Sequence, residues 1–479
     1  MQTTVDTSAD TAPEPNPYTV GKFAPVAHET ACELEAIEGE IPRDLFGAYV
    51  RNGPNPRFVA EGRYHPFDGD GMLHSVRFED GRAFYANRFI RTAGLAEEEA
   101  AGRALWKGIR ESARRETPAW PYKDTANTDV KLHHGVLVTS WYLCGIPYEV
   151  DPRSLETLGP ATFGGKLKTR VSAHVKIDAA TGDMMIFDYG LRPPFMSYGV
   201  VDRSGVLVHT ADVPLPGPRL PHDMAITDRH SILMDLPVFP DVESLKKGRW
   251  RSGFHPDVPS RFAVLPRFGK TEDIRWFEAS PAYIYHVVNS WDEDDAVVMI
   301  AHRVHPRSFE KVASLPSEHV RFLQNLTMDA ELYRYRFDLR TGRTSEEKLD
   351  DRNAEFPSIH AGMQGRKTRF GYAMEMPREG GLLFTGLVKY DTDTGAAEAH
   401  SFGPGVYGSE APFAPREGAN DEDDGYVATF VVDEGRGASE LWIYDAKSIA
   451  KGPVVKLRIP VRMPLGFHAC WAPGAEMRP

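Results

Sequence analysis

The stretch "VKIDAATGDMMIF", residues 175–187, contains the pattern that decides the fold. An alternating apolar run ends at Asp178, two residues and Thr-Gly follow, and a second apolar run begins. The glycine supplies the positive φ of a tight turn, and the aspartate caps that turn through a local side-chain hydrogen bond. The same form returns in "YRFDLRTGRTSEEKL" (335–349) and "VKYDTDTGAAEAHSF" (388–402). Each copy therefore predicts a β-hairpin.

The spacing of these hairpins favours an all-β fold made of repeated blades. The turns at Asp338 and Asp391 are separated by close to the roughly 40–50-residue period of a propeller blade. Shorter turns recur at 78–86 and 201–209, and 42 glycines and 37 prolines suit many tight connections. Turn signals continue without a linker-like break, so we predict one β-propeller. A β-sandwich or several small β-domains are the alternatives.

Length and composition bound the organisation of the chain. Residues 1–16 are polar and lack the features of a signal peptide, so we expect a disordered tail followed by a single domain over 17–479. The formal net charge of −12 gives no reason to expect nucleic acid. No apolar run reaches the roughly 18–20 residues of a transmembrane helix. Three scattered cysteines exclude a disulfide framework and favour the cytoplasm.

Two stretches are predicted to be helices inserted between strands. They cover about 93–116, rich in Ala, Leu, Glu and Arg, and about 314–326, and we expect them to cover one face of the propeller. The mixed apolar and basic stretch 238–254 is a candidate for peripheral membrane contact, with a solvated loop as the alternative.

Four of the seventeen histidines share a setting on or beside an apolar run. They are His174 in "RVSAHVKID", His222 in "RLPHDMAIT", His286 in "AYIYHVVNSW" and His468 in "PLGFHACW". Their wide spacing excludes a compact zinc motif, but inner strands of propeller blades converge on one axis. Four neutral imidazoles suit iron, copper, nickel or zinc better than magnesium or calcium, and in an octahedral field they leave two adjacent positions open. The alternative is four core histidines bonded to backbone carbonyls. Asp223, beside His222, is predicted to cap its turn.

The motifs around these histidines resemble those of the carotenoid cleavage oxygenases, a non-haem iron family that includes lignostilbene and isoeugenol oxygenases. The resemblance runs from about residue 17 to 472. Its segments include "GEIPRDLFGAYVRNGPNPRF" (39–58), "TANTDV" (125–130), "NAEFPSIH" (353–360) and "SEAPFAPREG" (409–418). It implies a seven-bladed propeller with a helical dome over the metal face. It also implies one Fe(II) per chain, held by His174, His222, His286 and His468.

The resemblance further implies carboxylates that accept hydrogen bonds from three of the ligand imidazoles, which fixes each ring and raises its basicity. Glu355 and Glu410 match two of these positions. The third is occupied in many relatives by a glutamate after a tryptophan, but here Trp141 is followed by Tyr142. A phenol oxygen, a water or a backbone carbonyl is then expected to orient that ligand. Thr128 matches a threonine whose methyl group crowds one open iron position; an ordinary strand threonine is the alternative.

Two positions bear on the substrate. Relatives that cleave phenolic stilbenes or phenylpropenes carry a lysine and a tyrosine that bind the 4-hydroxyl group, whereas this chain has Trp141 and Ile109 there. An unpaired buried hydroxyl costs roughly 1–3 kcal/mol, and a polyene would instead gain roughly 25 cal/mol per Å² of apolar area buried. With Phe67 of "HPFDGDGM" (65–72), these residues predict an apolar substrate pocket.

The sequence therefore predicts an Fe(II) dioxygenase that uses O2 to cleave a conjugated C=C bond of a carotenoid or apocarotenoid into two carbonyl products. No organic cofactor is expected, because the alkene supplies the electrons and no phosphate-binding loop is present. Cleavage of a stilbene or phenylpropene, and a propeller that binds or isomerises polyenes without cleaving them, are the alternatives.

Overall fold

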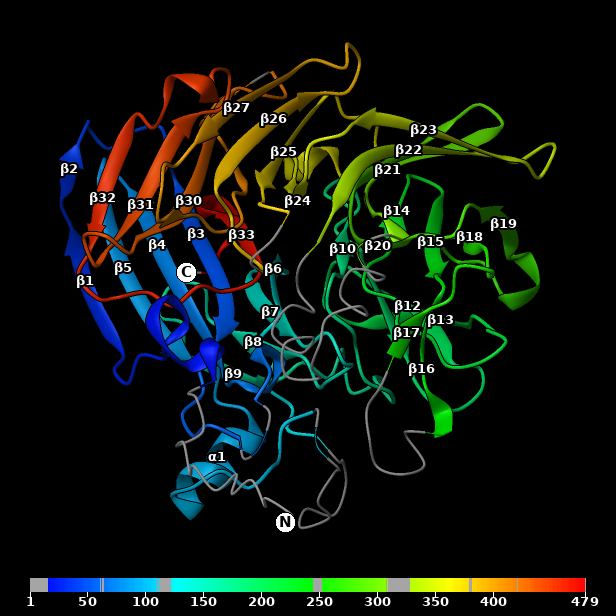
Figure 1. Cartoon of the computed structure of the whole chain (residues 1–479), viewed down its shortest axis with the longest axis horizontal. Coiled ribbons are helices and arrows are strands. Elements are labelled where there is room, and N and C mark those ends of the chain that lie inside the picture. The colour runs from blue at the N-terminus through cyan, green and yellow to red at the C-terminus, as the bar shows by residue number, and fades with distance from the viewer. Residues whose placement is uncertain are drawn as a thin grey trace, which may run out of the picture.

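Seven antiparallel sheets of four to six strands are arranged around a common centre, and a separate two-stranded sheet lies outside this count (Figure 1). The computed structural model describes residues 16–60, 62, 64–109, 111, 122–243, 252–306, 308, 328–378, 381–419 and 421–478. The predicted seven-bladed β-propeller is confirmed.

Five sheets are built from consecutive segments of the chain. Their strands are β6 (Asp129–His133), β7 (Val136–Ser140), β8 (Tyr148–Val150) and β9 (Thr157–Pro160); β10 (Lys176–Ile177), β11 (Met184–Tyr189), β12 (Met196–Val201) and β13 (Leu207–Asp212); β14 (Ala225–Ile226), β15 (His230–Asp235), β18 (Ser260–Pro266) and β19 (Arg275–Ala279); β20 (Tyr283–Glu293), β21 (Ala296–Val304), β22 (Ala330–Asp338) and β23 (Thr344–Asp350); and β24 (Ala354–Ser358), β25 (Phe370–Glu375), β26 (Gly386–Asp391) and β27 (Ala397–Ser401).

The other two sheets close the ring by combining strands from both ends of the chain. One contains β1 (Thr30–Leu34), β5 (Arg82–Phe89), β4 (Gly71–Glu79), β3 (Gly47–Pro54) and β33 (Ala469–Pro473); the other contains β2 (Ala36–Glu38), β32 (Val455–Ile459), β31 (Ala438–Asp445), β30 (Gly425–Asp433), β28 (Val406–Tyr407) and β29 (Phe413–Pro415). β33 pairs with β3 from Gly47↔Pro473 to Arg51↔Ala469. β2 pairs with β32. Two strand pairings therefore hold the ring shut.

Apolar side chains fill all seven interfaces between neighbouring sheets. Each of seven clusters of buried residues joins one sheet to the next; one links Tyr49 and Phe78 of the first sheet to Phe430 and Leu441 of the last. Because strand side chains alternate between faces, each sheet buries both faces against its two neighbours. In the five consecutive sheets the first strand lies nearest the axis, and in the sheet of β1 to β5 the strand nearest the axis is β33.

The Asp-x-x-Thr-Gly turns have the predicted chemistry. Asp338 Oδ1 accepts the backbone N–H of Thr341 at 2.7 Å, and Gly342 follows with φ 75°. In the turns at Asp178 and Asp391 the Oδ1 atom likewise accepts a backbone N–H, from Ala180 and Thr394 respectively, and Gly182 (φ 77°) and Gly395 (φ 73°) follow. These turns connect β10 to β11, β22 to β23 and β26 to β27.

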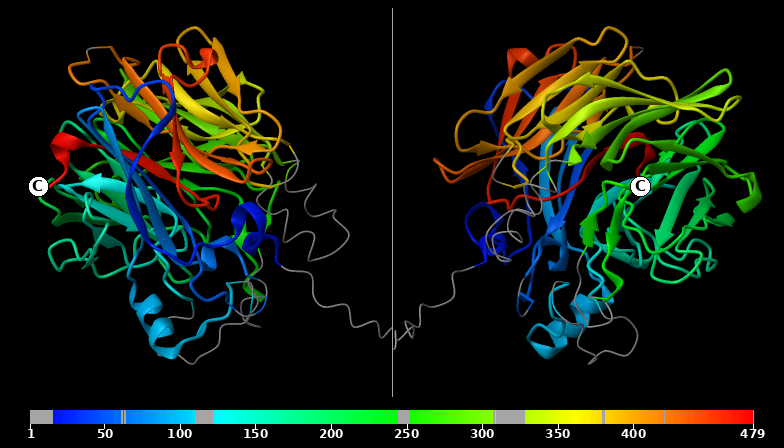
Figure 2. Two further views of the ribbon diagram at one scale, coloured as in Figure 1. Left: turned by 90° about the vertical axis from the view of Figure 1, so that its left-hand side faces the viewer. Right: turned by 45° about the vertical axis from the view of Figure 1, so that its right-hand side comes forward.

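The helical part of the described chain is smaller than predicted. α1 spans Ala93–Ala101, capped by the Thr92 side chain and ended by Gly102 at φ 66°. The helix predicted over 93–116 is therefore wrong over residues 102–109, which are not helical, whereas 112–116 lie outside the described residues. Figure 2 shows α1 at one end of the molecule, outside the ring of sheets. The helix predicted over 314–326 lies outside the described residues. Seven short 3₁₀ helices complete the elements: η1 (Pro17–Thr19), η2 (Gly21–Phe23), η3 (Pro66–Asp68), η4 (Thr271–Asp273), η5 (Ala361–Met363), η6 (Ile449–Lys451) and η7 (Gly474–Glu476).

Three further expectations can be compared with the structure. Residues 1–15 of the predicted tail are outside the described part, whereas Asn16 is placed and caps η1. In the stretch 238–254, β16 (Val238–Pro240) pairs with β17 (Ser252–Phe254), and 244–251 are not described. Within the described residues, no helix is long and apolar enough to cross a membrane.

Candidate metal centre

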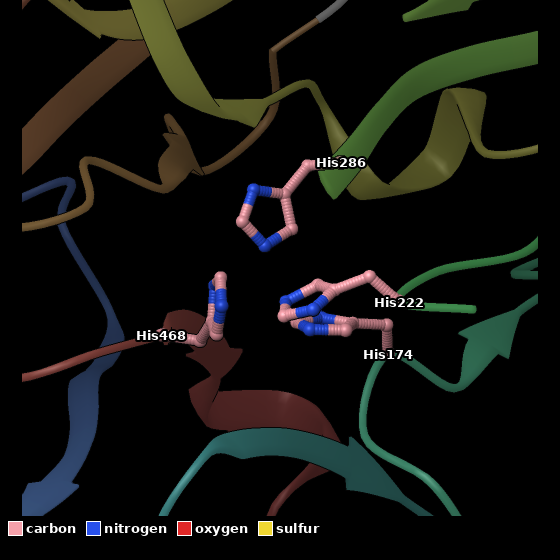
Figure 3. Close-up of side chains that lie close together, drawn as sticks. All are labelled: His174, His222, His286 and His468. Carbon is pink, nitrogen blue, oxygen red and sulfur yellow. The ribbon is translucent and has the colours of Figure 1, made fainter. Parts of the chain in front are cut away.

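Four histidine side chains meet at the centre of the ring. The potential ligand atoms of His174, His222, His286 and His468 all lie within 4.8 Å of one another, and all four residues are buried. His174 precedes β10, His222 precedes β14, His286 lies in β20 and His468 precedes β33. Figure 3 shows the four rings pointing toward one another from different segments of the chain. The structure thus brings together the four histidines grouped from the sequence.

Local irregularities of the inner strands direct two of these side chains. His174 has a φ of 67°, in the left-handed region that non-glycine residues rarely adopt. The pairing of β20 with β21 shifts register between Ile284 and Val287, a segment that contains His286. Bulges and strained residues of this kind re-aim a side chain and concentrate at functional sites.

The two predicted glutamates hold two of the imidazoles. Glu355 Oε2 lies 2.5 Å from His286 Nδ1, and Glu410 Oε1 lies 3.2 Å from His468 Nδ1. Each glutamate also accepts a backbone N–H, from Phe356 and Ala469 respectively. Because Nδ1 is engaged in both rings, Nε2 is the atom left for a metal.

Asp129, which was not predicted from the sequence, holds a third imidazole. Its Oδ2 accepts the backbone N–H of His174 at 3.1 Å and lies 3.5 Å from His174 Nδ1. Burial by itself raises the pKa of Asp129, but Lys131 and His174 outweigh burial and hold that pKa well below its ordinary value. Asp129 is therefore an anion. A carboxylate at the start of an apolar inner strand, next to Thr128, is the sequence signal that could have identified it.

Tyr142 contacts a ligand, but through its ring and not through its phenol oxygen. Its ring centroid lies 4.2 Å from that of His222, with 37° between the planes. Its hydroxyl lies 3.4 Å from the hydroxyl of Tyr283. Within the described part of the chain, the buried Nδ1 of His222 has no hydrogen-bond partner. The Tyr142 phenol oxygen therefore does not orient the His222 imidazole, in contrast to the expectation from the sequence.

Thr128 lies against the site with its hydroxyl fully engaged. The hydroxyl donates to Asn127 Oδ1 at 3.1 Å and accepts the backbone N–H of Tyr142 at 3.1 Å. The backbone carbonyl of Thr128 accepts the N–H of His468 at 3.2 Å. These bonds fix the side-chain rotamer and hence the direction of the methyl group.

The three predicted substrate-binding residues converge on η3. The Trp141 indole N–H donates to the carbonyl of Phe67 at 3.0 Å, and the backbone N–H of Ile109 donates to Asp68 Oδ1 at 2.8 Å. The Phe67 ring lies 5.2 Å from Tyr142 and 5.3 Å from Phe467, between centroids. Trp141 has no exposed surface, and its indole holds the backbone of Phe67 in place.

Further aromatic rings, which were not predicted from the sequence, surround the histidines. Phe356 stacks on His468, with ring centroids 4.5 Å apart and 12° between the planes. The ring centroid of Tyr285 lies 4.9 Å from that of His222. An apolar pocket adjoins these aromatic rings, and one of its lining residues is Phe467, which precedes His468. The lining residues are Tyr18, Phe23, Pro54, Pro66, Leu382, Leu465, Gly466 and Phe467.

The electrostatics of the site suit a transition metal. Burial lowers the pKa of His174, His222 and His286, with the neighbouring histidines adding to the effect. These imidazoles are therefore neutral near pH 7, which is the form that binds metal. Nε2 of His174 and of His286 is buried without a hydrogen-bond partner among the described residues. Unpaired nitrogens directed at one point, with the opposite nitrogens on carboxylates, fit a divalent ion.

Comparison with known proteins agrees with this geometry. The sequence model of the retinal pigment epithelial membrane protein family matches residues 23–473. The carotenoid 9,10(9',10')-cleavage dioxygenase 1 of Arabidopsis thaliana is 34% identical over 496 residues, covering 96% of this chain and 90% of the relative. The lignostilbene dioxygenase of Pseudomonas brassicacearum superposes with a TM-score of 0.86 at 30% identity, covering 96% and 98% of the two chains. A variant of the Synechocystis apocarotenoid oxygenase superposes with a TM-score of 0.82 at 26% identity, covering 94% of this chain and 97% of that one.

The fold and these relatives define an oxidoreductase built on a β-propeller. The chain belongs to the retinal pigment epithelial membrane protein family, which is the family of the carotenoid cleavage oxygenases.

Proposed function

We propose that this protein is an Fe(II)-dependent dioxygenase that cleaves a conjugated C=C bond of a carotenoid or apocarotenoid. The observation that carries the proposal is the cluster of four buried imidazoles, three of them held by Glu355, Glu410 and Asp129, next to an aromatic and apolar pocket. Two of the relatives are named for cleavage of carotenoids or oxygenation of apocarotenoids.

His174, His222, His286 and His468 would hold the iron. Bound there, Fe(II) would supply the activation of O2 that converts one C=C bond into two carbonyl groups. The four imidazoles add no charge to the ion, and four ligands leave two coordination positions for small molecules. Thr128, fixed by its hydrogen bonds to Asn127 and Tyr142, would restrict one of those positions through its methyl group.

The pocket would bind and orient the substrate through apolar contact. Phe467 lines the pocket and its ring lies 5.3 Å from that of Phe67, between centroids. Apolar substrate surface buried there would contribute roughly 25 cal/mol per Å² removed from water. The same enclosure would exclude water from the reacting alkene and strengthen the electrostatic effect of the buried carboxylates.

A phenolic stilbene is the second candidate substrate. The lignostilbene dioxygenase is a close structural neighbour, with a TM-score of 0.86. The residues expected to bind a phenol are replaced by Trp141 and Ile109, and the Trp141 N–H is already occupied by the Phe67 carbonyl. This replacement favours the polyene.

The decisive experiment incubates Fe(II)-loaded protein with apocarotenoids, carotenoids and 4-hydroxystilbenes under O2. Mass spectrometry of the aldehyde products identifies both the substrate class and the bond that is cut. We expect aldehydes from a carotenoid or apocarotenoid. Products from the hydroxystilbenes alone would establish the second candidate, and no cleavage of any alkene by iron-loaded protein would refute the proposal.

A further inference from the structure

Asp223 lies one residue after His222 and is almost completely buried. Its carboxylate lies 2.8 Å (Oδ1) and 3.0 Å (Oδ2) from Lys176 Nζ. Oδ2 also accepts the backbone N–H of Val287 at 2.8 Å. Oδ1 accepts the N–H of Met224 at 2.7 Å, the local cap predicted from the sequence. The contacts with Lys176 and Val287 go beyond capping.

These contacts connect three of the histidine-bearing segments. Asp223 follows His222, Val287 follows His286, and Lys176 is two residues after His174 in the same segment. The three segments belong to three different sheets, those of β14, β20 and β10. The Asp223 carboxylate therefore fixes the spacing of three chain segments, each of which contains one of the central histidines.

His222 is the imidazole that most needs such support. Carboxylates lie next to Nδ1 of His174, His286 and His468, whereas Nδ1 of His222 has no hydrogen-bond partner among the described residues. A ring without an acceptor can be held only by packing and by its own backbone. The backbone of His222 is continuous with Asp223.

We propose that Asp223, together with Lys176, is a positioning residue for the metal centre. It holds the backbone of His222 in register with those of His174 and His286, in place of a carboxylate bonded to the His222 ring. The inference rests on the proposed function in that it assumes a metal at the four histidines. Supporting residues of this kind change metal affinity by about 10–100-fold when they are replaced.

An aspartate is required at this position for a geometric reason. The carboxylate oxygens accept hydrogen bonds from the Lys176 ammonium and from the backbone N–H groups of Val287 and Met224. An ionised aspartate has no donor of its own. An asparagine would present an amide NH₂ to one of these donors. A glutamate would keep the charge, but its additional methylene would separate the three segments.

The test is a Co²⁺ titration of metal-depleted full-length protein, followed by visible absorption and calorimetry. We expect Asp223→Asn to weaken Co²⁺ binding by at least about tenfold and to change the d–d bands, because the ligand geometry relaxes. Asp178→Asn is the matched control: Asp178 is also a buried aspartate and pairs with Arg267 at 2.6 Å, but its carboxylate bonds to Ala180, Thr181, Arg267 and Arg366, which do not adjoin the histidines. This control should lose thermal stability and keep the Co²⁺ affinity and spectrum of the parent.

Asp223→Glu separates geometry from charge and provides a second variant if Asp223→Asn does not fold. Positioning predicts that Asp223→Glu also binds Co²⁺ weakly with an altered spectrum. Parent-like affinity and spectrum in Asp223→Glu would show that only the charge matters and would overturn the inference. Parent-like binding by Asp223→Asn would overturn it as well. If the parent protein itself bound neither Co²⁺ nor Fe²⁺, the proposed function would fail instead, so the two failures are distinct.

Discussion

The ring of Tyr142 lies against the imidazole of His222, with 4.2 Å between the ring centroids. It occupies the position where, by the resemblance to its family, a glutamate would have oriented a ligand. The backbone of Tyr142 is held on both sides: its N–H donates to Thr128, and its carbonyl accepts from Ser172 and Tyr189. An aromatic contact thus replaces a charged hydrogen bond at this imidazole.

Tyr142→Phe should therefore leave the metal centre intact. It keeps the ring and removes the hydroxyl with its 3.4 Å contact to the Tyr283 hydroxyl, so we expect a loss of about 1 kcal/mol in stability and metal affinity within twofold of the parent. Tyr142→Ala removes the ring and should cost about 3–5 kcal/mol and weaken metal binding. Thermal unfolding and metal titration measure both. Equal weakening by Phe and Ala would mean that the hydroxyl, and not the ring, supports His222.

Thr128 offers a way to separate its hydroxyl from its methyl group. Thr128→Val keeps the shape but leaves the buried N–H of Tyr142 without its acceptor, which should cost about 1–3 kcal/mol of stability. Thr128→Ser keeps the hydroxyl, so we expect parent-like unfolding but an altered KM for O2. Chemical denaturation and oxygen-dependent kinetics test the pair. A Ser variant with parent-like oxygen kinetics would remove Thr128 from the proposed oxygen site.

Polar side chains placed at Trp141 and Ile109 should change the substrate preference. Trp141→Lys/Ile109→Tyr should raise cleavage of 4-hydroxystilbene, because the pair supplies a cation and a hydroxyl for the phenol. Trp141→Met/Ile109→Phe is the matched control, since it changes the same positions without adding either polar group. Relative kcat/KM for the stilbene and an apocarotenoid is the measurement. An equal gain in both double variants would show that space, and not phenol binding, limits the stilbene.

A buried histidine away from the metal centre predicts the acid response of the fold. His302 in β21 has no exposed surface, and burial lowers its pKa from 6.5 to about 3. The folded state disfavours protonation of His302, whereas the unfolded state does not. The free energy of unfolding therefore keeps its full value, as far as His302 is concerned, above pH 6.5 and falls as the pH drops toward 3. The loss from this residue should reach about 2 kcal/mol at pH 5.

His302→Leu should remove that part of the pH dependence. Neither ring nitrogen of His302 has a hydrogen-bond partner among the described residues, so leucine should also be tolerated at neutral pH. Urea unfolding between pH 5 and 7 measures the slope, with a substitution of the exposed His28, His28→Asn, as the control. An unchanged slope in His302→Leu would show that other groups control the acid response.

Local chemistry was predictable from the sequence wherever one short segment determines it. The Asp178, Asp338 and Asp391 turns formed as expected, because each turn is capped within four residues of the same chain. The motifs around the four histidines located the centre. The C-terminal end of α1 was missed because Gly102 adopts a left-handed conformation within an otherwise helix-favouring composition.

The remaining features depend on contacts between distant segments. Asp129 faces His174 from another sheet, and Asp223 reaches Lys176 and Val287 across two sheets. Phe356 stacks on His468, more than a hundred residues away. No spacing in the sequence indicates these pairs, because the closure of the ring creates them.

Metal analysis of His222→Ala beside the parent protein tests the central claim most directly. The parent should bind one Fe(II) per chain and cleave the alkene, whereas His222→Ala should lose iron and turnover while circular dichroism and thermal unfolding show that it is folded. A folded His222→Ala protein that retained stoichiometric iron and full activity would contradict the four-histidine metal centre.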